Sequence, residues 1–129
     1  MLKRIKLLLE RNAIYIAILI SISIAILSLV KIDPVAVPDF SSSDKFFHSI
    51  AYFFLMLSWL YAFYKKDSFL KNVRYLILGC IIYGIILEVL QGTTTNYRTA
   101  SYLDMLANSL GVVLAVLVFH IFEKKIRVI

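Results

Sequence analysis

The chain has 129 residues, of which 61% are apolar and 17% are charged. A typical soluble domain has ~45–50% apolar and ~25% charged residues, and its core could not bury this much hydrophobic side chain. The mean hydropathy of +0.86 indicates that lipid is the natural solvent. These values exclude a soluble enzyme, and the single cysteine, Cys80, excludes a disulfide scaffold. The net charge of +6 could indicate nucleic-acid binding, but in a membrane chain it more often reports orientation.

Four apolar runs are long enough to span the ~30 Å of bilayer hydrocarbon, which takes about 20 helical residues. They cover residues 13–30, 46–64, 73–91 and 103–122. Together they use most of the chain, so only short loops remain and there is no room for a separate soluble domain. The sequence therefore predicts an all-α integral membrane bundle of four transmembrane helices, which forms a single domain over residues 1–129.

The first run also has features of a secretory signal peptide, because it is preceded by four basic residues: Lys3, Arg4, Lys6 and Arg11. Its 18 residues exceed the apolar core of a usual signal peptide, and no clear A-x-A cleavage site follows it. We therefore expect an uncleaved transmembrane span. Cleavage would leave the orientation of the other three helices unchanged.

Basic residues are distributed unevenly between the two sides of the predicted bundle. The N-terminal segment holds four, the loop between the second and third runs holds three with Arg74 at its edge, and the C-terminal tail holds three, which makes eleven of the 14. These segments share one side, and the opposite side has only Lys31, Lys45 and Arg98. By the positive-inside rule, both termini are cytoplasmic and the loops 31–45 and 92–102 face outward.

Polar residues of the last three runs gather near the outer interface. Charged groups inside a spanning helix are costly unless they are paired or hydrated, so each one needs an explanation. Spacings of three or four residues place Asp44 with His48, Glu88 with Gln91, and Asp104 with Asn108, each pair on one face of a helix. We expect these faces to line one polar cavity that opens toward the outer leaflet.

In order and spacing, these residues resemble the VanZ-like family of small bacterial membrane proteins, named for an accessory factor in teicoplanin resistance. The family pattern is Asp-Lys-x-x-His at the start of a helix, Glu-x-x-Gln at the end of the next, then Arg and an Asp-x-x-x-Asn-x-x-Gly helix. Here these motifs are Asp44-Lys45-Phe46-Phe47-His48, Glu88-Val89-Leu90-Gln91, Arg98, and Asp104 with Asn108 and Gly111. The resemblance covers roughly residues 40–120. It implies a multi-pass protein of the bacterial cytoplasmic (inner) membrane with a role in the envelope or in the response to glycopeptide antibiotics, and it implies no settled reaction.

Some of these residues also have purely structural explanations. Asp44 follows three serines and precedes an apolar run, as a helix-capping acid does. Ser101 and Asp104 fit the capping-box pattern, and Lys45 fits a lysine that snorkels to the interface. Four polar residues are harder to explain in this way: His48, Glu88, Arg98 and Asn108. For them the structural alternative is a polar lock between helices.

Two functions fit this set of residues. In an enzyme, His48 is the general acid or base and either Asp44 or Glu88 orients it, while cations bind an anionic group. The candidate catalytic residues are His48, Glu88, Asp44 and Asp104, and the candidate substrate-binding residues are Lys45, Gln91, Arg98 and Asn108. The substrate class is a lipid-linked envelope precursor or a lipid head group. In a non-catalytic protein, the same cavity binds such a group or docks a partner.

A metal site with His48, Asp44, Glu88 and Asp104 as ligands is conceivable, but no tight ligand spacing supports it. We therefore predict neither a metal nor another cofactor. A channel or transporter is disfavoured because the cytoplasmic half of the helices is apolar. The expected partners are membrane lipids and not nucleic acid, and the pattern leaves the oligomeric state open.

Overall fold

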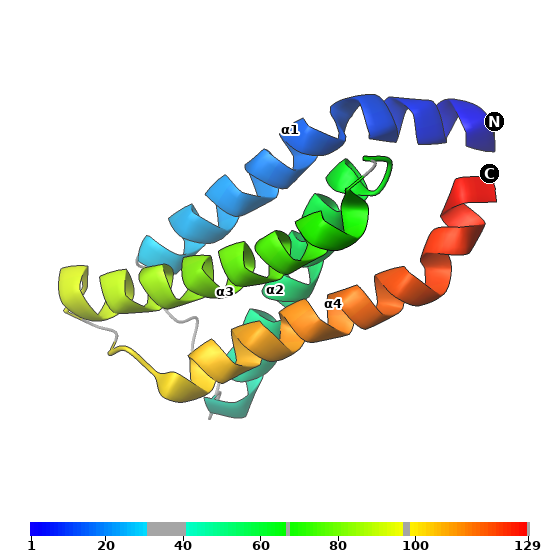
Figure 1. Ribbon diagram of the computed structural model, residues 1–129. Helices are drawn as coiled ribbons and strands as arrows, with labels where there is room; N and C mark the ends of the chain where they lie inside the picture. Colours follow the sequence, from blue (N-terminus) through cyan, green and yellow to red (C-terminus); the bar gives the residue numbers. More distant parts are fainter. Residues whose placement is uncertain (31–40, 67, 97–98, 129) are drawn as a thin grey trace.

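The structure is a computed structural model that describes residues 1–30, 41–66, 68–96 and 99–128, with the side chains of 41–43 excepted. These residues form four long helices: α1 (Leu2–Leu29), α2 (Ser41–Phe63), α3 (Phe69–Thr94) and α4 (Tyr102–Val128) (Figure 1). No strand occurs in these ranges. Each helix is long and apolar enough to cross a membrane, which confirms the predicted all-α membrane bundle.

The helices extend past the predicted apolar runs at their polar ends. The helix α1 begins at Leu2 instead of residue 13, and α4 continues to Val128 instead of ending at residue 122. The added turns are rich in Lys, Arg and Glu, which are good helix formers. The backbone therefore stays helical where the apolar run ends.

The helix α2 contacts all three other helices, and its most extensive contact is with α4. Small residues on α4 allow this close approach. A Cβ atom at Gly111 would overlap the backbone oxygen of Ser49 on α2, and Ala115, one turn further along α4, is fully buried. Close backbone approach through small residues is the usual way in which membrane helices associate.

The core of the bundle lies where α2 meets α4. Leu55, Met56 and Leu60 of α2 and Val112 of α4 are each at most 1% exposed. Large apolar side chains on the outside of all four helices are exposed, and α1 buries only alanines, Ala13 and Ala17. Lipid chains solvate such a surface, so the exposed Leu and Ile side chains face the membrane rather than marking an incomplete core.

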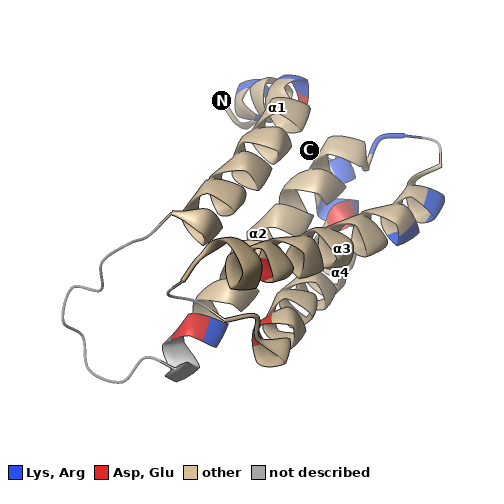
Figure 2. Ribbon diagram, turned by 90° about the vertical axis from the view of Figure 1, so that its left-hand side faces the viewer, with Lys and Arg blue, Asp and Glu red and all other residues tan. Residues whose placement is uncertain are grey.

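Both termini lie at the same end of the bundle (Figure 1). Most of the described Lys and Arg residues gather at this end, which we call the terminal end (Figure 2). Here the Glu10 carboxylate of α1 accepts hydrogen bonds from Tyr64 and, at 2.6 Å, from Lys65. Arg127 of α4 donates to the backbone oxygen of Tyr64 at 2.9 Å. The location of this end on the cytoplasmic side stays a prediction from the positive-inside rule.

Candidate functional site

At the end of the bundle away from the termini, α2 and α4 bring four of the predicted site residues together. Asp44 and His48 are one turn apart on α2, and Asp104 and Asn108 are one turn apart on α4. The close contact of Gly111 with α2 lies about one turn deeper, so it sets the separation of the two helices at this level. Each pair thereby faces the other across the interface.

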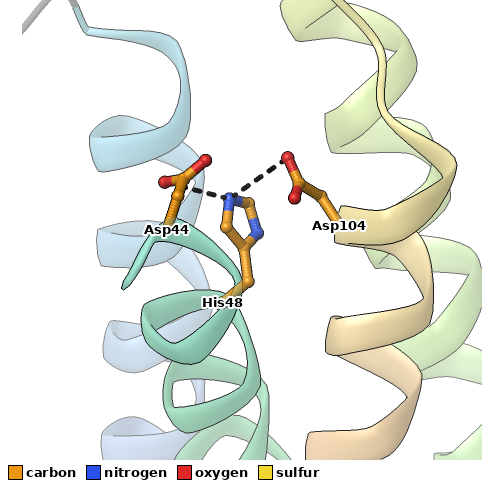
Figure 3. Close-up of side chains that lie close together, drawn as sticks. All are labelled: Asp44, His48 and Asp104. Atoms are coloured by element: carbon orange, nitrogen blue, oxygen red, sulfur yellow. Dashed lines mark ion pairs between the residues drawn. The ribbon is translucent and has the colours of Figure 1, made fainter. Parts of the chain in front are cut away.

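The two ring nitrogens of His48 have different surroundings. Nδ1 lies 3.0 Å from Oδ1 of Asn108, and because an amide oxygen only accepts, Nδ1–H is the donor. Nε2 faces two carboxylates, at 3.9 Å from Oδ1 of Asp44 and 4.0 Å from Oδ2 of Asp104 (Figure 3). Asn108 therefore sets the ring orientation and the tautomer, and Nε2 is directed into the space between the carboxylates.

Asp44, His48 and Asp104 form a compact group that we call the His–Asp cluster. One ligand atom from each residue lies within 4.8 Å of the other two. The side chains of His48 and Asp104 are 14% and 13% exposed, whereas that of Asp44 is 43% exposed. The cluster is thus enclosed on the α4 side and open beside Asp44, and its donor atoms are of the kinds that hold divalent cations.

Glu88 lies outside this cluster and holds the start of α4 instead. Its Oε1 accepts the backbone N–H of Ser101 at 2.8 Å, while the Ser101 hydroxyl accepts the backbone N–H of Asp104 at 3.4 Å. The predicted capping box is therefore only half formed, because in a complete one the Asp104 side chain would accept the Ser101 N–H. Since Glu88 takes that N–H, the Asp104 carboxylate is available to face His48.

The other predicted site residues have separate positions. Gln91, only 2% exposed, donates through Nε2 to the backbone oxygen of Ser28 at 2.7 Å and so links α3 to α1. Lys45 follows Asp44 on α2 and is half-buried. Arg98 lies outside the described residues. Of the two carboxylates predicted to orient His48, Asp44 faces Nε2 at 3.9 Å, while Glu88 binds elsewhere; Nδ1–H of His48 donates its hydrogen bond to Asn108.

A cavity of about 170 Å³ lies beside the cluster, between α1 and α2. Asp44, His48 and Ser28 supply its polar lining. The remaining lining is apolar or aromatic: Ile24, Leu27, Phe47, Ala51 and Tyr52. In this small cavity the Asp44 carboxylate therefore lies next to apolar walls that continue along α1.

One contribution to the site was missed at the sequence level, and for a second the sequence indicated close packing without its partners. Ser28 contributes through its backbone oxygen, which carries no sequence signal, and through its place in the cavity wall. Gly84 of α3 gives Asn108 and Tyr52 their space, since a Cβ there would lie 3.2 Å from Nδ2 of Asn108 and 3.0 Å from Cε1 of Tyr52. In the sequence, Gly84 shares a helix face with Glu88, which indicates close helix packing there but does not identify the residues against which Gly84 packs.

Comparison with known proteins gives one match. The model of the family described as VanZ/LLP1 matches residues 5–123, which extends the resemblance found in the motifs to include α1. No curated protein and no solved structure matches the chain.

Proposed function

The chain belongs to the VanZ-like family, and from that premise we propose that its polar end holds the head group of a membrane lipid or of a lipid-linked envelope precursor. The proposed position is the outer leaflet of the bacterial cytoplasmic membrane. The observation that carries this proposal is the cavity between α1 and α2, where Asp44, His48 and Ser28 adjoin apolar walls. A lipid has the same division, because its polar head group is bonded to an apolar chain.

The size of the cavity limits which part of the ligand it encloses. Its volume of about 170 Å³ is below the ~300–1,000 Å³ of pockets that enclose a whole drug-sized molecule. A phosphate with its nearest attached atoms is of the right size, while a larger saccharide or peptide would extend out past Asp44, the most exposed member of the cluster. The lipid chain would lie against α1, whose large apolar side chains face the membrane.

A second candidate function is a polar lock that holds the helices without any ligand. Three hydrogen bonds favour it: His48 with Asn108 between α2 and α4, Gln91 with Ser28 between α3 and α1, and Glu88 with Ser101 at the start of α4. Such bonds contribute about 0.6–2 kcal/mol each in membrane proteins. The lock accounts for these bonds, but it assigns no role to the cavity or to the carboxylates that face Nε2 of His48.

Filling the cavity tests the head-group proposal. Ala51 lines the cavity, whereas its neighbour Ile50 is 36% exposed and is not part of the lining, so Ala51→Trp and Ile50→Trp form a matched pair. Full-length protein in nanodiscs would be mixed with a phosphorylated polyisoprenoid, with phosphatidylglycerol or with uncharged diacylglycerol, and bound lipid would be counted by mass spectrometry. We expect retention of the phosphorylated lipids in the wild type and in Ile50→Trp, and a loss of at least about tenfold in Ala51→Trp, since indole fills this volume.

Equal retention in the two variants would refute the head-group site and favour the lock. Thermal unfolding of both variants shows whether each is folded, so that a loss of lipid is not confused with a loss of structure. The teicoplanin susceptibility of a glycopeptide-sensitive host that expresses each variant gives a cellular readout of the role that the family name suggests. A protective effect carried by Ile50→Trp but not by Ala51→Trp would connect that role to the cavity.

A further inference from the structure

We propose that Asp44, His48 and Asp104 bind a divalent transition metal ion, Zn²⁺ or Mn²⁺. We also propose that this ion, rather than a protein side chain, contacts the phosphate of the lipid head group. The second statement rests on the proposed function, whereas the metal site itself does not. This proposal departs from the sequence-based prediction of no metal. Spacing gave no support to these ligands, because they come from two helices that meet only in the tertiary fold.

The positions of the donor atoms fit one ion. The separations of Nε2 from the two carboxylate oxygens are 3.9 and 4.0 Å, and the ligand atoms of the three residues all lie within 4.8 Å of one another. An ion at equal distance from three atoms with these separations would lie about 2.5 Å from each of them. Small side-chain rotations would shorten these three distances to the ~2.0–2.2 Å of zinc–nitrogen and zinc–oxygen bonds. One imidazole and two carboxylates suit Zn²⁺ or Mn²⁺ better than a soft metal.

The surroundings of His48 are those of a metal ligand. Metal-binding histidines almost always donate the N–H of the second ring nitrogen to a carbonyl, carboxylate or water, which fixes the ring and the tautomer. Here Nδ1–H donates to Oδ1 of Asn108 at 3.0 Å, and Nε2 is turned toward the carboxylates. Asn108 is 3% exposed and packs against Gly84, so the supporting group is itself held in place.

The position of the Asp104 carboxylate is compatible with a bound cation. Asp104 is 9% exposed, and no hydrogen bond from the described residues reaches its carboxylate, whose single described pairing is with His48 at 4.0 Å. The Ser101 N–H that a capping box would supply is bound by Glu88. The side chain is 13% exposed, so the carboxylate is only partly shielded from solvent, and a metal ion at the centre of the cluster would neutralise its charge.

A metal ion also explains how an anionic head group can approach two carboxylates. Without a cation, Asp44 and Asp104 would repel a phosphate at this distance. Three protein ligands leave coordination positions open on Zn²⁺ or Mn²⁺, and a phosphate oxygen can take one of them. The cavity between α1 and α2 has both Asp44 and His48 in its wall, so it leads to the proposed ion.

Metal titration of the purified full-length protein tests the site. The protein, freed of its affinity tag and stripped with a chelator, would be titrated with Zn²⁺ or Mn²⁺ by calorimetry, with Mg²⁺ and Ca²⁺ for comparison. We expect one Zn²⁺ or Mn²⁺ per chain. His48→Gln and Asp44→Asn should weaken binding on the order of 100-fold or more, because each removes a direct ligand. Asp44 is the safer second variant, since its side chain is 43% exposed and its replacement disturbs the fold least.

Matched controls come from α4 at the terminal end, where His120 and Glu123 lie away from the cluster. His120→Gln and Glu123→Gln should bind metal as the wild type does. Failure of the wild type to bind one ion per chain, or equal affinity in His48→Gln and His120→Gln, would overturn the metal site.

Lipid retention with and without chelator separates the two proposals. A loss of phosphorylated lipid with chelator, restored by added metal, supports the contact between ion and phosphate. Metal binding without lipid retention would leave the ion in place and refute the head-group function. Lipid retention that is unaffected by chelator, in a protein that binds no metal, would refute the ion and leave the head-group function standing.

Discussion

The contact between α2 and α4 can be tested by adding a single methyl group. In Gly111→Ala the new Cβ would overlap the backbone oxygen of Ser49 and would lie 3.0 Å from the backbone nitrogen of Phe53. Backbone atoms cannot rotate away as a side chain can, so α4 must move away from α2 by on the order of 1 Å. Gly79→Ala is the matched control on α3, because a Cβ there has nothing within 4 Å.

Three effects determine how much Gly111→Ala changes the free energy of unfolding. Overpacking a close interface costs about 1–3 kcal/mol. A displacement of this size would stretch the 3.0 Å hydrogen bond between His48 and Asn108 beyond bonding distance, at a cost of about 1 kcal/mol. Replacing Gly by Ala in a helix returns up to about 1 kcal/mol. We therefore expect the free energy of unfolding to fall by about 1–3 kcal/mol in Gly111→Ala, and to stay constant or rise slightly in Gly79→Ala.

The single tryptophan provides the assay. The indole of Trp59 on α2 donates to the Ser21 hydroxyl on α1 at 3.2 Å, so its fluorescence reports whether the bundle is intact. Denaturant titrations in detergent would be compared for the two glycine variants and the wild type. The same Gly111→Ala protein should bind Zn²⁺ or Mn²⁺ more weakly, since the displacement separates His48 from Asp104. Unchanged stability of Gly111→Ala would refute the reasoning that this glycine sets the distance between α2 and α4.

Three further predictions follow from individual contacts. Asn108→Ala leaves Nδ1–H of His48 without its acceptor, so the free energy of unfolding should fall by about 1–3 kcal/mol and metal affinity should fall 10–100-fold. Unchanged affinity in the calorimetric titration would contradict the supporting role of the amide. Gln91→Leu removes a hydrogen bond between α3 and α1 and should lower the free energy of unfolding by about 1 kcal/mol, while metal binding is preserved. A loss of metal binding would show that this end of α1 belongs to the ion site. In a cysteine-free background, Thr99→Cys should react with an impermeant thiol reagent in intact cells and Lys66→Cys should not, and the reverse labelling would overturn the orientation.

The helices and their order are predictable because each depends on a local property. Twenty or so apolar residues in succession must be helical in lipid, where every backbone polar group needs a partner within its own segment. The pairing of Asp44 with His48, and of Asp104 with Asn108, is equally local, since a spacing of four residues places two side chains on the same face. Alternation of four spans then brings both pairs, which lie near the starts of α2 and α4, to the end of the bundle away from the termini (Figure 1).

The choice of partners across helices was not predictable in the same way. Asp44 or Glu88 was expected to orient His48. Asp44, on the same helix, does face Nε2, but the Nδ1 partner is Asn108 of α4, and Glu88 binds the backbone of Ser101. These choices depend on how far each helix is rotated about its axis, and residue types and spacing do not specify that rotation. Arg98, the cation expected to bind an anionic group, lies outside the described residues, so that part of the prediction stays a prediction.

The sequence by itself determined the membrane environment, the number of spans and the depth at which the polar residues lie, because composition and topology act along the chain. The tertiary structure decided which of those residues meet. Close packing of Gly111 against α2 places Asp104 opposite His48, and the capture of the Ser101 N–H by Glu88 leaves the Asp104 carboxylate facing Nε2. Both contacts join segments that are distant along the chain, so the arrangement of ligand atoms exists only once the helices have packed.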